Sequence, residues 1–89
     1  MSISCTATVS NDKGIHARPS SEIAKEALKY KSDILINYDG KTANAKDVLQ
    51  LIMLELFKGT KVEIVAEGVD ERKAIEAIKN YIEKEYEYD

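Results

Sequence analysis

The sequence GIHARP, residues 14–19, contains the only histidine and the only proline of this 89-residue chain, His16 and Pro19. Proline fits the first turn of a helix but not its interior, so a helix is predicted to begin here. Apolar residues then recur at helical spacing, at Ile23, Ala24, Ala27, Leu28 and Tyr30. We therefore expect a helix from Ala17 to about Tyr30, with His16 at or beside its N-terminal cap.

The residue types of this stretch suit a phosphoryl acceptor. A helix N-terminus presents unpaired backbone N–H groups and the positive end of the helix dipole, which together attract an anion. The same field disfavours imidazolium, so the ring of His16 is expected to stay neutral and nucleophilic near neutral pH. Arg18 can hold a phosphoryl group through a bidentate contact, whereas Ser20 and Ser21 are expected to face water. The alternative is a packed or surface histidine beside a solvated arginine.

The rest of the chain predicts an α+β domain of two layers. Segments that alternate or are rich in β-forming residues indicate strands at about 3–9, 33–38, 41–44 and 61–67. Asp39-Gly40 favours a tight hairpin turn, because both residues tolerate positive φ. A second helix is expected to follow Asp47 and end by Gly59, and a third to follow a cap at Asp70. The buried stripe of the third helix is expected to be Ala74, Ile75, Ile78, Tyr81 and Ile82. The element order is then β-α-β-β-α-β-α.

Composition narrows the class of protein further. The length suits one domain, 1–89, and the net charge of −3 argues against nucleic acid as the main partner. No signal-peptide core and no apolar run of membrane-spanning length is present, so a cytoplasmic protein without a membrane partner is expected. The single Cys5 cannot form an internal disulfide and is expected to be a small buried hydrophobe. Neither a zinc site nor another metal site has the necessary spacing of ligands, so no cofactor is expected.

The segment from Val48 to Phe57 is too apolar for an ordinary surface helix. Placed at helical steps, its apolar residues surround the axis, and only Gln50 and Glu55 are polar. One interpretation is a short helix that unwinds, so that Leu54, Leu56 and Phe57 enter the core. The other is a docking patch for a partner protein, which the apolar character of the segment favours.

Five pieces of sequence resemble one family. They are GIHARP, the hairpin Tyr38-Asp39-Gly40-Lys41, Asn44-Ala45-Lys46, Lys58-Gly59, and Ala66-Glu67-Gly68. In this order of elements, they resemble HPr, the histidine-containing phosphocarrier of the bacterial phosphoenolpyruvate-dependent sugar phosphotransferase system. The resemblance spans nearly the whole chain. It implies an open-faced β-sandwich, in which a four-stranded antiparallel sheet is covered on one face by three helices.

The resemblance also implies roles for individual residues. His16 would be phosphorylated at Nδ1, Arg18 would contact the phosphoryl group, and the backbone N–H groups of Ala17 and Arg18 would complete its cradle. Enzyme I would be the donor, and IIA domains or proteins the acceptors. By position, the patch that meets these partners would be Val48, Leu49 and Ile52. The protein would then be a phosphoryl-transfer intermediate rather than a turnover enzyme.

Asp47 and Glu55 depart from the family pattern. Many HPr proteins carry a serine at the position of Asp47, which a kinase phosphorylates in some bacteria; an aspartate cannot be modified in that way. Asp47 could imitate phosphoserine, or it could simply cap the helix in a capping box with Gln50. Glu55 replaces a usual glycine, so the second helix is expected to run longer. These departures leave two alternatives, a regulatory module that binds a regulatory protein and a nitrogen-branch paralogue with a different IIA partner.

Overall fold

Seven elements follow one another in the predicted order. The computed structural model describes residues 2–11, 14–15 and 17–84. Its strands are β1 (Ser2–Thr8), β2 (Asp33–Tyr38), β3 (Lys41–Asn44) and β4 (Lys61–Glu67). Its helices are α1 (Ala17–Ala27), α2 (Val48–Met53) and α3 (Glu71–Glu83). The limits of β2, β3 and β4 agree with the sequence prediction.

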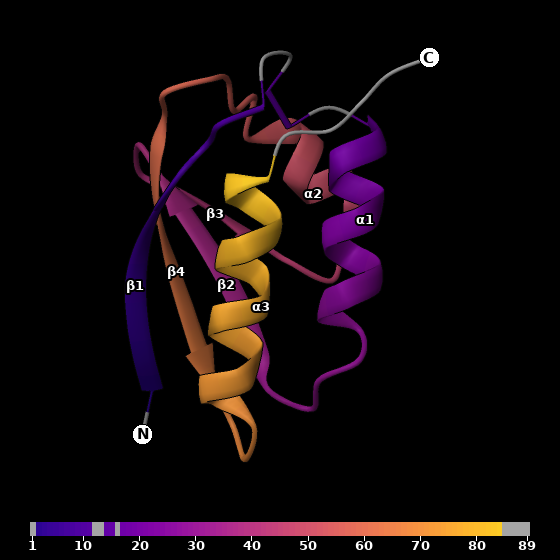
Figure 1. Ribbon diagram of the computed structural model, residues 1–89, viewed down its shortest axis with the longest axis vertical. Helices are drawn as coiled ribbons and strands as arrows, with labels where there is room; N and C mark the ends of the chain where they lie inside the picture. The colour runs from indigo at the N-terminus through magenta and orange to yellow at the C-terminus, as the bar shows by residue number, and fades with distance from the viewer. Residues whose placement is uncertain (1, 12–13, 16, 85–89) are drawn as a thin grey trace.

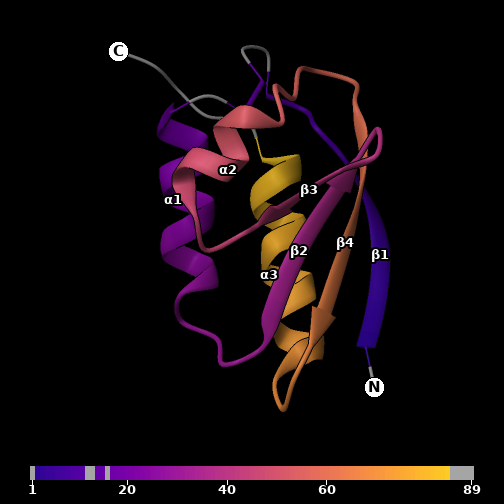
Figure 2. The same cartoon turned by 180° about the vertical axis from the view of Figure 1, so that it is seen from behind.

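The four strands form one antiparallel sheet in the order β1-β4-β2-β3. All three helices lie on one face of this sheet, and the other face is open (Figures 1 and 2). α3 packs on β1 and β4, and α1 packs against both α3 and α2. The fold is therefore the predicted open-faced β-sandwich, which confirms the expected fold class.

The core lies between the sheet and the helices. Alternate residues of the central strands point inward, namely Ile34, Ile36, Val62, Ile64 and Ala66. Helix positions at a spacing of three and four residues meet them, namely Ile23, Ala24, Ala27, Ala74, Ile75, Ile78 and Ile82. Tyr81 was expected in this stripe but is only half-buried. Cys5 was expected to be buried and is also only partly covered, although burial still raises the pKa of its thiol.

The first helix ends earlier than its apolar spacing predicts. Its regular part stops at Ala27, and the amides of Lys29 and Tyr30 then donate to carbonyls three residues back, which tightens the turn. Leu28 still donates its amide to Ala24 O at 3.0 Å in the helical pattern, but its side chain lies outside the buried stripe of Ile23, Ala24 and Ala27 and is 65% exposed. The expected end at Tyr30 and the burial of Leu28 were both wrong.

Asp70 occupies the N-cap position of α3 but does not cap it. Its carboxylate accepts hydrogen bonds from the amides of Lys31 and Ser32, both at 2.9 Å, and from the Ser32 hydroxyl. These bonds lower the pKa of Asp70. The bond from the Ser32 hydroxyl has the largest effect, and the bond from the Lys31 amide has the next largest. Asp70 therefore ties the α1–β2 loop to the start of α3, and the predicted helix cap was wrong.

Candidate functional site

The loop that leads from β1 to α1 is held by hydrogen bonds at both of its ends. At its start, the Val9 amide donates to the carbonyl oxygen of Thr60, and the Gly59 amide donates to the carbonyl oxygen of Val9, both at 2.8 Å. Gly59 and Thr60 lie directly before β4. At its end, the amide of Ile15 donates to the carbonyl oxygen of Leu56 at 3.0 Å. The side chain of Ile15 is fully buried in the core. The residue directly before His16 in the chain is thus fixed in position.

Gly14 permits this close approach. Its φ is +73°, and a Cβ at this position would overlap the Leu56 carbonyl oxygen and lie 2.9 Å from the Cα of Phe57. The buried Asn11 closes the same turn, because its side-chain amide donates to the Gly14 carbonyl at 2.7 Å. Only glycine combines the left-handed conformation with this contact.

α1 begins at Ala17, the residue that directly follows His16 in the sequence. Ala17 and Arg18 are exposed, Pro19 is buried, and no acidic residue lies in the first turn to compete with a bound anion. The first amides of a helix have no intrahelical acceptor, which is the property that makes helix starts common sites for anions. His16 itself lies outside the described residues.

Ser20 differs from the expectation that it faces water. Its side chain is fully buried, and its hydroxyl has no hydrogen-bond partner within the described structure. The reason is its position on α1, because Ser20 lies on the same side of the helix as Ile23, Ala24 and Ala27. Ser21 is exposed as predicted.

Asp47 is the N-cap of α2. Its carboxylate accepts from the Gln50 amide at 3.2 Å, as the predicted capping box requires. The reciprocal bond of that motif is different: the Gln50 side chain donates to the Asp47 carboxylate at 3.3 Å and accepts from the Asn44 amide at 2.8 Å. Asp47 therefore supplies a fixed negative charge at the start of α2 and joins this helix to the end of β3.

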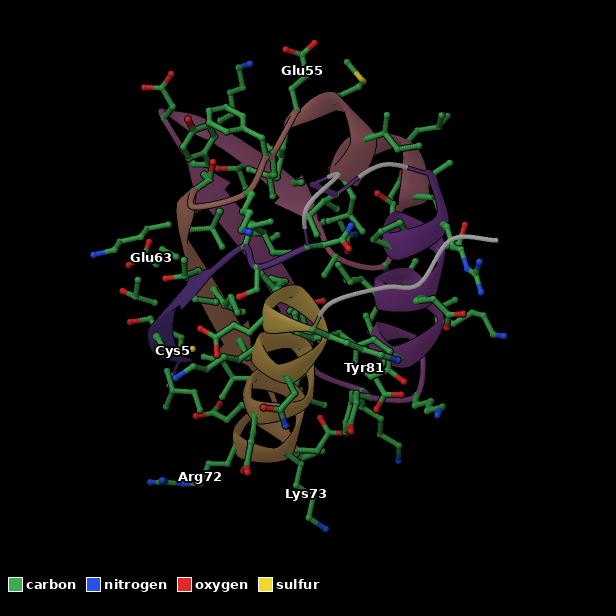
Figure 3. All side chains as sticks on the ribbon, turned by 45° about the horizontal axis from the view of Figure 1, so that its top comes forward. Cys5, Glu55, Glu63, Arg72, Lys73 and Tyr81 are labelled. Carbon is green, nitrogen blue, oxygen red and sulfur yellow. The ribbon has the colours of Figure 1, made fainter. Side chains whose placement is uncertain are left out.

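Helix α2 is shorter than the sequence suggested. It ends at Met53, and Glu55 takes a φ of 55°, the left-handed conformation that a glycine adopts without strain. The prediction that Glu55 lengthens the helix was wrong, because Glu55 adopts this left-handed conformation and the helix has already ended at Met53. Its side chain points away from the molecule (Figure 3).

Several apolar residues of α2 and of the turn after it are exposed. Helix α2 itself lies beside α1 (Figure 2). Of the residues predicted for docking, Leu49 is 71% exposed, while Val48 and Ile52 are half-buried. Met53 and Phe57 extend the patch and are 71% and 62% exposed. The interpretation in which the helix unwinds is confirmed for Leu54 and Leu56, which are buried, and is wrong for Phe57. We call these five residues, Val48, Leu49, Ile52, Met53 and Phe57, the α2 patch.

The family follows from a direct comparison with known proteins. The family model for PTS-HPr, the HPr component phosphorylation site of the PTS, matches residues 3–84. The chain belongs to the HPr family. It is thus a phosphocarrier-type component of the phosphotransferase system rather than a classical enzyme, as the sequence motifs indicated.

Individual HPr proteins are similar over most of the chain. The phosphocarrier protein HPr of Buchnera aphidicola is 46% identical over 63 residues, which are 71% of this chain and 74% of that protein. The HPr-like protein Crh of Bacillus subtilis is 38% identical over 72 residues, 81% of this chain and 85% of that one. The crystal structure of HPr from Bacillus anthracis matches with a TM-score of 0.88 at 34% identity, over 92% of this chain and 98% of that one.

Sequence reasoning for this HPr-family site missed Met53, the Leu56 carbonyl and the buried hydroxyl of Ser20. The spacing of Leu49 and Met53, four residues apart, could have placed both on one face of a helix. The Leu56 contact had no sequence signal besides Gly14, because it joins residues that are far apart in the chain.

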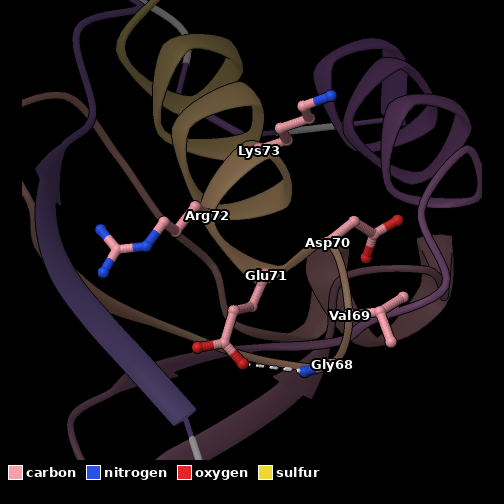
Figure 4. A pocket seen from close by; sticks show the side chains of 6 residues that line it. All are labelled: Gly68, Val69, Asp70, Glu71, Arg72 and Lys73. Carbon is pink, nitrogen blue, oxygen red and sulfur yellow. Dashed lines mark hydrogen bonds between the residues drawn. The ribbon is translucent and has the colours of Figure 1, made fainter.

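Other surface features of this HPr-family chain lie away from the start of α1. A pocket of about 430 Å³ is lined by residues 68–73, at the turn from β4 to α3 (Figure 4). Among residues 2–11, 14–15 and 17–84, no group of three or more His, Cys, Asp or Glu side chains could hold a metal ion. Within the same ranges, no helix is long and apolar enough to cross a membrane.

Proposed function

We propose that this protein accepts a phosphoryl group on His16 from enzyme I and passes it to IIA domains or proteins. The observation that carries the proposal is the fixed position of the two residues that flank His16 in the sequence. Ile15, immediately before it, is buried and bonded to Leu56, and α1 begins immediately after it at Ala17. The proposal needs an acceptor at this helix start, and position 16 falls between these two residues in the sequence.

The phosphoryl group would be bound by the first turn of α1. The Ala17 and Arg18 amides supply donors, and the exposed Arg18 guanidinium supplies a positive charge that can form two parallel bonds to phosphate oxygens. Pro19 contributes no donor but starts the helix, and it anchors the turn through its buried ring.

The electrostatic field at the start of α1 suits such a site both before and after phosphorylation. Before transfer it disfavours imidazolium and keeps the ring neutral, with a lone pair at Nδ1 that can attack phosphorus. In the transfer, the new N–P bond forms as the bond between phosphorus and the donor group of enzyme I breaks. Afterwards the same amides stabilise the anionic phosphoryl group. In the second step the group leaves Nδ1 for the IIA partner, and the ring is regenerated.

The α2 patch would bring enzyme I and IIA partners against the site. Val48, Leu49 and Ile52 are proposed as the contact, and Met53 and Phe57 enlarge it. Exposed apolar groups of this kind are typical of surfaces that bind another protein. We further propose that the protein acts in the cytoplasm and that residues 1–89 form one domain.

Intact-mass measurement with phosphoenolpyruvate and enzyme I tests this proposal. We expect the wild type to gain one acid-labile phosphoryl group, and His16→Ala to gain none. His16→Ala should retain its cooperative unfolding, which separates loss of the acceptor from loss of the fold. A wild type that gains no phosphoryl group from its cognate enzyme I would rule out the carrier function.

A second candidate is a regulatory binding module. It is supported by the 38% identity to Crh and by Asp47, whose carboxylate is a permanent charge at the start of α2. In this function, phosphorylation of His16 would only modulate the binding of a regulatory protein. Replacing Asp47 by Ser would then weaken that binding and leave phosphoryl transfer nearly intact, whereas His16→Ala would leave the binding intact.

A further inference from the structure

Glu55 has a backbone conformation that residues with a side chain rarely adopt. Its φ is +55°, and Asp39 is the only other non-glycine residue with a positive φ in the described part of the chain. Asp39 lies in the hairpin turn between β2 and β3, where aspartate is common because its short side chain can bond locally to the backbone. The longer side chain of glutamate gives no such local advantage. Because strained residues of this kind cluster at functional sites, Glu55 is a candidate for a functional role.

The backbone around Glu55 is held on both sides. Its two neighbours in the chain, Leu54 and Leu56, are buried in the core. The Glu55 amide donates to the carbonyl oxygen of Ile52 at 3.0 Å. The carbonyl oxygen of Leu56 accepts from the Ile15 amide, also at 3.0 Å. Between these fixed neighbours, the side chain of Glu55 points away from the molecule (Figure 3).

Exposed apolar residues flank Glu55 in the sequence. Exposed and buried residues alternate through this turn, so that Met53, Glu55 and Phe57 are all exposed. Met53 and Phe57 belong to the α2 patch and are 71% and 62% exposed. The carboxylate of Glu55 makes no hydrogen bond or ion pair with any other described residue. Glu55 is thus a negative charge without a partner between two apolar members of the patch.

A protein that covers the α2 patch must also remove water from this carboxylate. Met53 and Phe57 each lie two residues from Glu55, so a surface in contact with both extends over the residue between them. A carboxylate that loses its water without gaining a partner opposes binding, whereas a charged hydrogen-bond donor compensates for the loss. The partner surface therefore needs a cationic group opposite Glu55.

We propose that Glu55 determines which enzyme I can dock, because the enzyme I of this system presents a lysine or arginine that pairs with the Glu55 carboxylate. This inference rests on the proposed function, in which enzyme I docks on the α2 patch. A guanidinium would bind the carboxylate through two parallel hydrogen bonds, and an ammonium group through its charge. An enzyme I with an acidic or apolar residue at that place would bind poorly. The pair thus supplies specificity, while the apolar residues of the patch supply contact area.

Steady-state phosphorylation by the cognate enzyme I tests the proposal. Glu55→Gln removes the charge but keeps the size of the side chain, and it should raise the KM of enzyme I for this protein by about three- to tenfold. Glu55→Lys places two cations opposite each other and should raise the KM by about tenfold or more. The kcat should stay near that of the wild type in both variants, because Glu55 lies outside the first turn of α1, where the phosphoryl group would bind.

Glu67→Gln is the matched control for the loss of one negative charge. Glu67 is exposed and is the last residue of β4, which ends far from α2, at the opposite end of the molecule (Figure 1). Its replacement should leave the KM unchanged. Added salt should raise the KM of the wild type and of Glu67→Gln more than that of Glu55→Gln, because only Glu55→Gln has no ion pair left to screen.

A charge exchange with enzyme I tests the pairing itself. The probe is a series of enzyme I variants, each with one surface lysine or arginine replaced by glutamate. One variant of the series should restore a low KM for Glu55→Lys and should have a raised KM for the wild type. A series in which no variant restores Glu55→Lys would overturn the proposed pair.

The outcomes separate this inference from the proposed function on which it rests. A wild type that its cognate enzyme I does not phosphorylate would overturn both. A raised KM in Leu49→Ser, together with an unchanged KM in Glu55→Gln and Glu55→Lys, would overturn only the role of Glu55. In that case the α2 patch would still be the docking surface, and its specificity would not depend on this charge.

Discussion

The amide of Ile15 donates to the carbonyl oxygen of Leu56 at 3.0 Å, and this bond joins the loop before His16 to the segment that follows α2. Phe57, the next residue, belongs to the α2 patch. A partner that contacts the patch therefore touches the same piece of backbone that holds the loop. The two parts of the proposed site are connected through one peptide group rather than through flexible side chains.

Gly14→Ala should disrupt this connection. The new Cβ would overlap the Leu56 carbonyl, and alanine disfavours a φ of +73°. We expect a loss of at least about 2 kcal/mol in the free energy of unfolding, together with slower phosphorylation. Gly40→Ala is the matched control, because φ is +77° there but no atom lies within 4 Å of the added Cβ. Urea unfolding should give a loss of only about 1 kcal/mol for this control; equal losses in the two variants would mean that the Leu56 contact has no role.

Glu55→Gly should stabilise the protein. Glu55 holds a left-handed conformation at φ 55°, which costs a residue with a Cβ about 1–2 kcal/mol and costs glycine much less. Part of that gain is offset by the greater freedom of glycine in the unfolded chain, so we expect a net gain of up to about 1 kcal/mol. Glu55→Ala keeps the strain and removes only the carboxylate, so its stability should stay near that of the wild type. Thermal unfolding distinguishes these variants, and a destabilised Glu55→Gly would contradict the assignment of strain.

The sequence was sufficient for local structure where one short signal governs it. Asp39-Gly40 marks a hairpin turn, and the observed strands end on either side of it, at Tyr38 and Lys41. The helix start at Ala17 follows in the same way from Pro19. Both signals depend on backbone preferences of one or two residues, which tertiary contacts did not override.

One error arose where a distant contact decided the outcome. Asp70 was expected to cap α3, but its carboxylate bonds to Lys31 and Ser32, 39 and 38 residues away in the chain. Two further errors concern apolar side chains. Leu28 was placed on the buried face of its helix, and Phe57 was expected to enter the core where its helix unwinds. Both side chains are exposed instead, at 65% and 62%. Apolar periodicity predicts a face but does not predict where the helix stops.

The stability contributed by Asp70 should depend on pH. Its pKa is lowered in the folded protein, chiefly by the Ser32 hydroxyl and then by the Lys31 amide. The contribution is therefore present in full above the unfolded pKa of about 3.9, and is lost as the pH falls through the folded pKa. Asp70→Asn should destabilise the protein at neutral pH, and the difference from the wild type should narrow in acid.

Urea unfolding of both proteins across this acid range measures the effect. Asp33→Asn is the control, because exposed Asp33 lies directly opposite Glu67 in the sheet. Removing one of two like charges should leave the stability unchanged or slightly higher at neutral pH. A constant difference between the wild type and Asp70→Asn at all pH values would show that the carboxylate charge is not what holds the loop.

Changes in the α2 patch should affect partner binding without affecting the fold. Leu49 and Met53 are both 71% exposed, so Leu49→Ser and Met53→Ser remove little buried area and should change the free energy of unfolding by less than about 0.5 kcal/mol. Each should raise the KM of enzyme I for this protein, because the lost apolar contact exists only in the complex.

Leu35→Ser is the surface control, since Leu35 is 38% exposed on the open face of the sheet and should leave KM unchanged. Leu51→Ala is the opposite control: Leu51 is fully buried in the same helix, and its truncation should cost about 2–5 kcal/mol of stability. Steady-state transfer assays would contradict the proposed docking role if Leu49→Ser and Leu35→Ser gave the same KM.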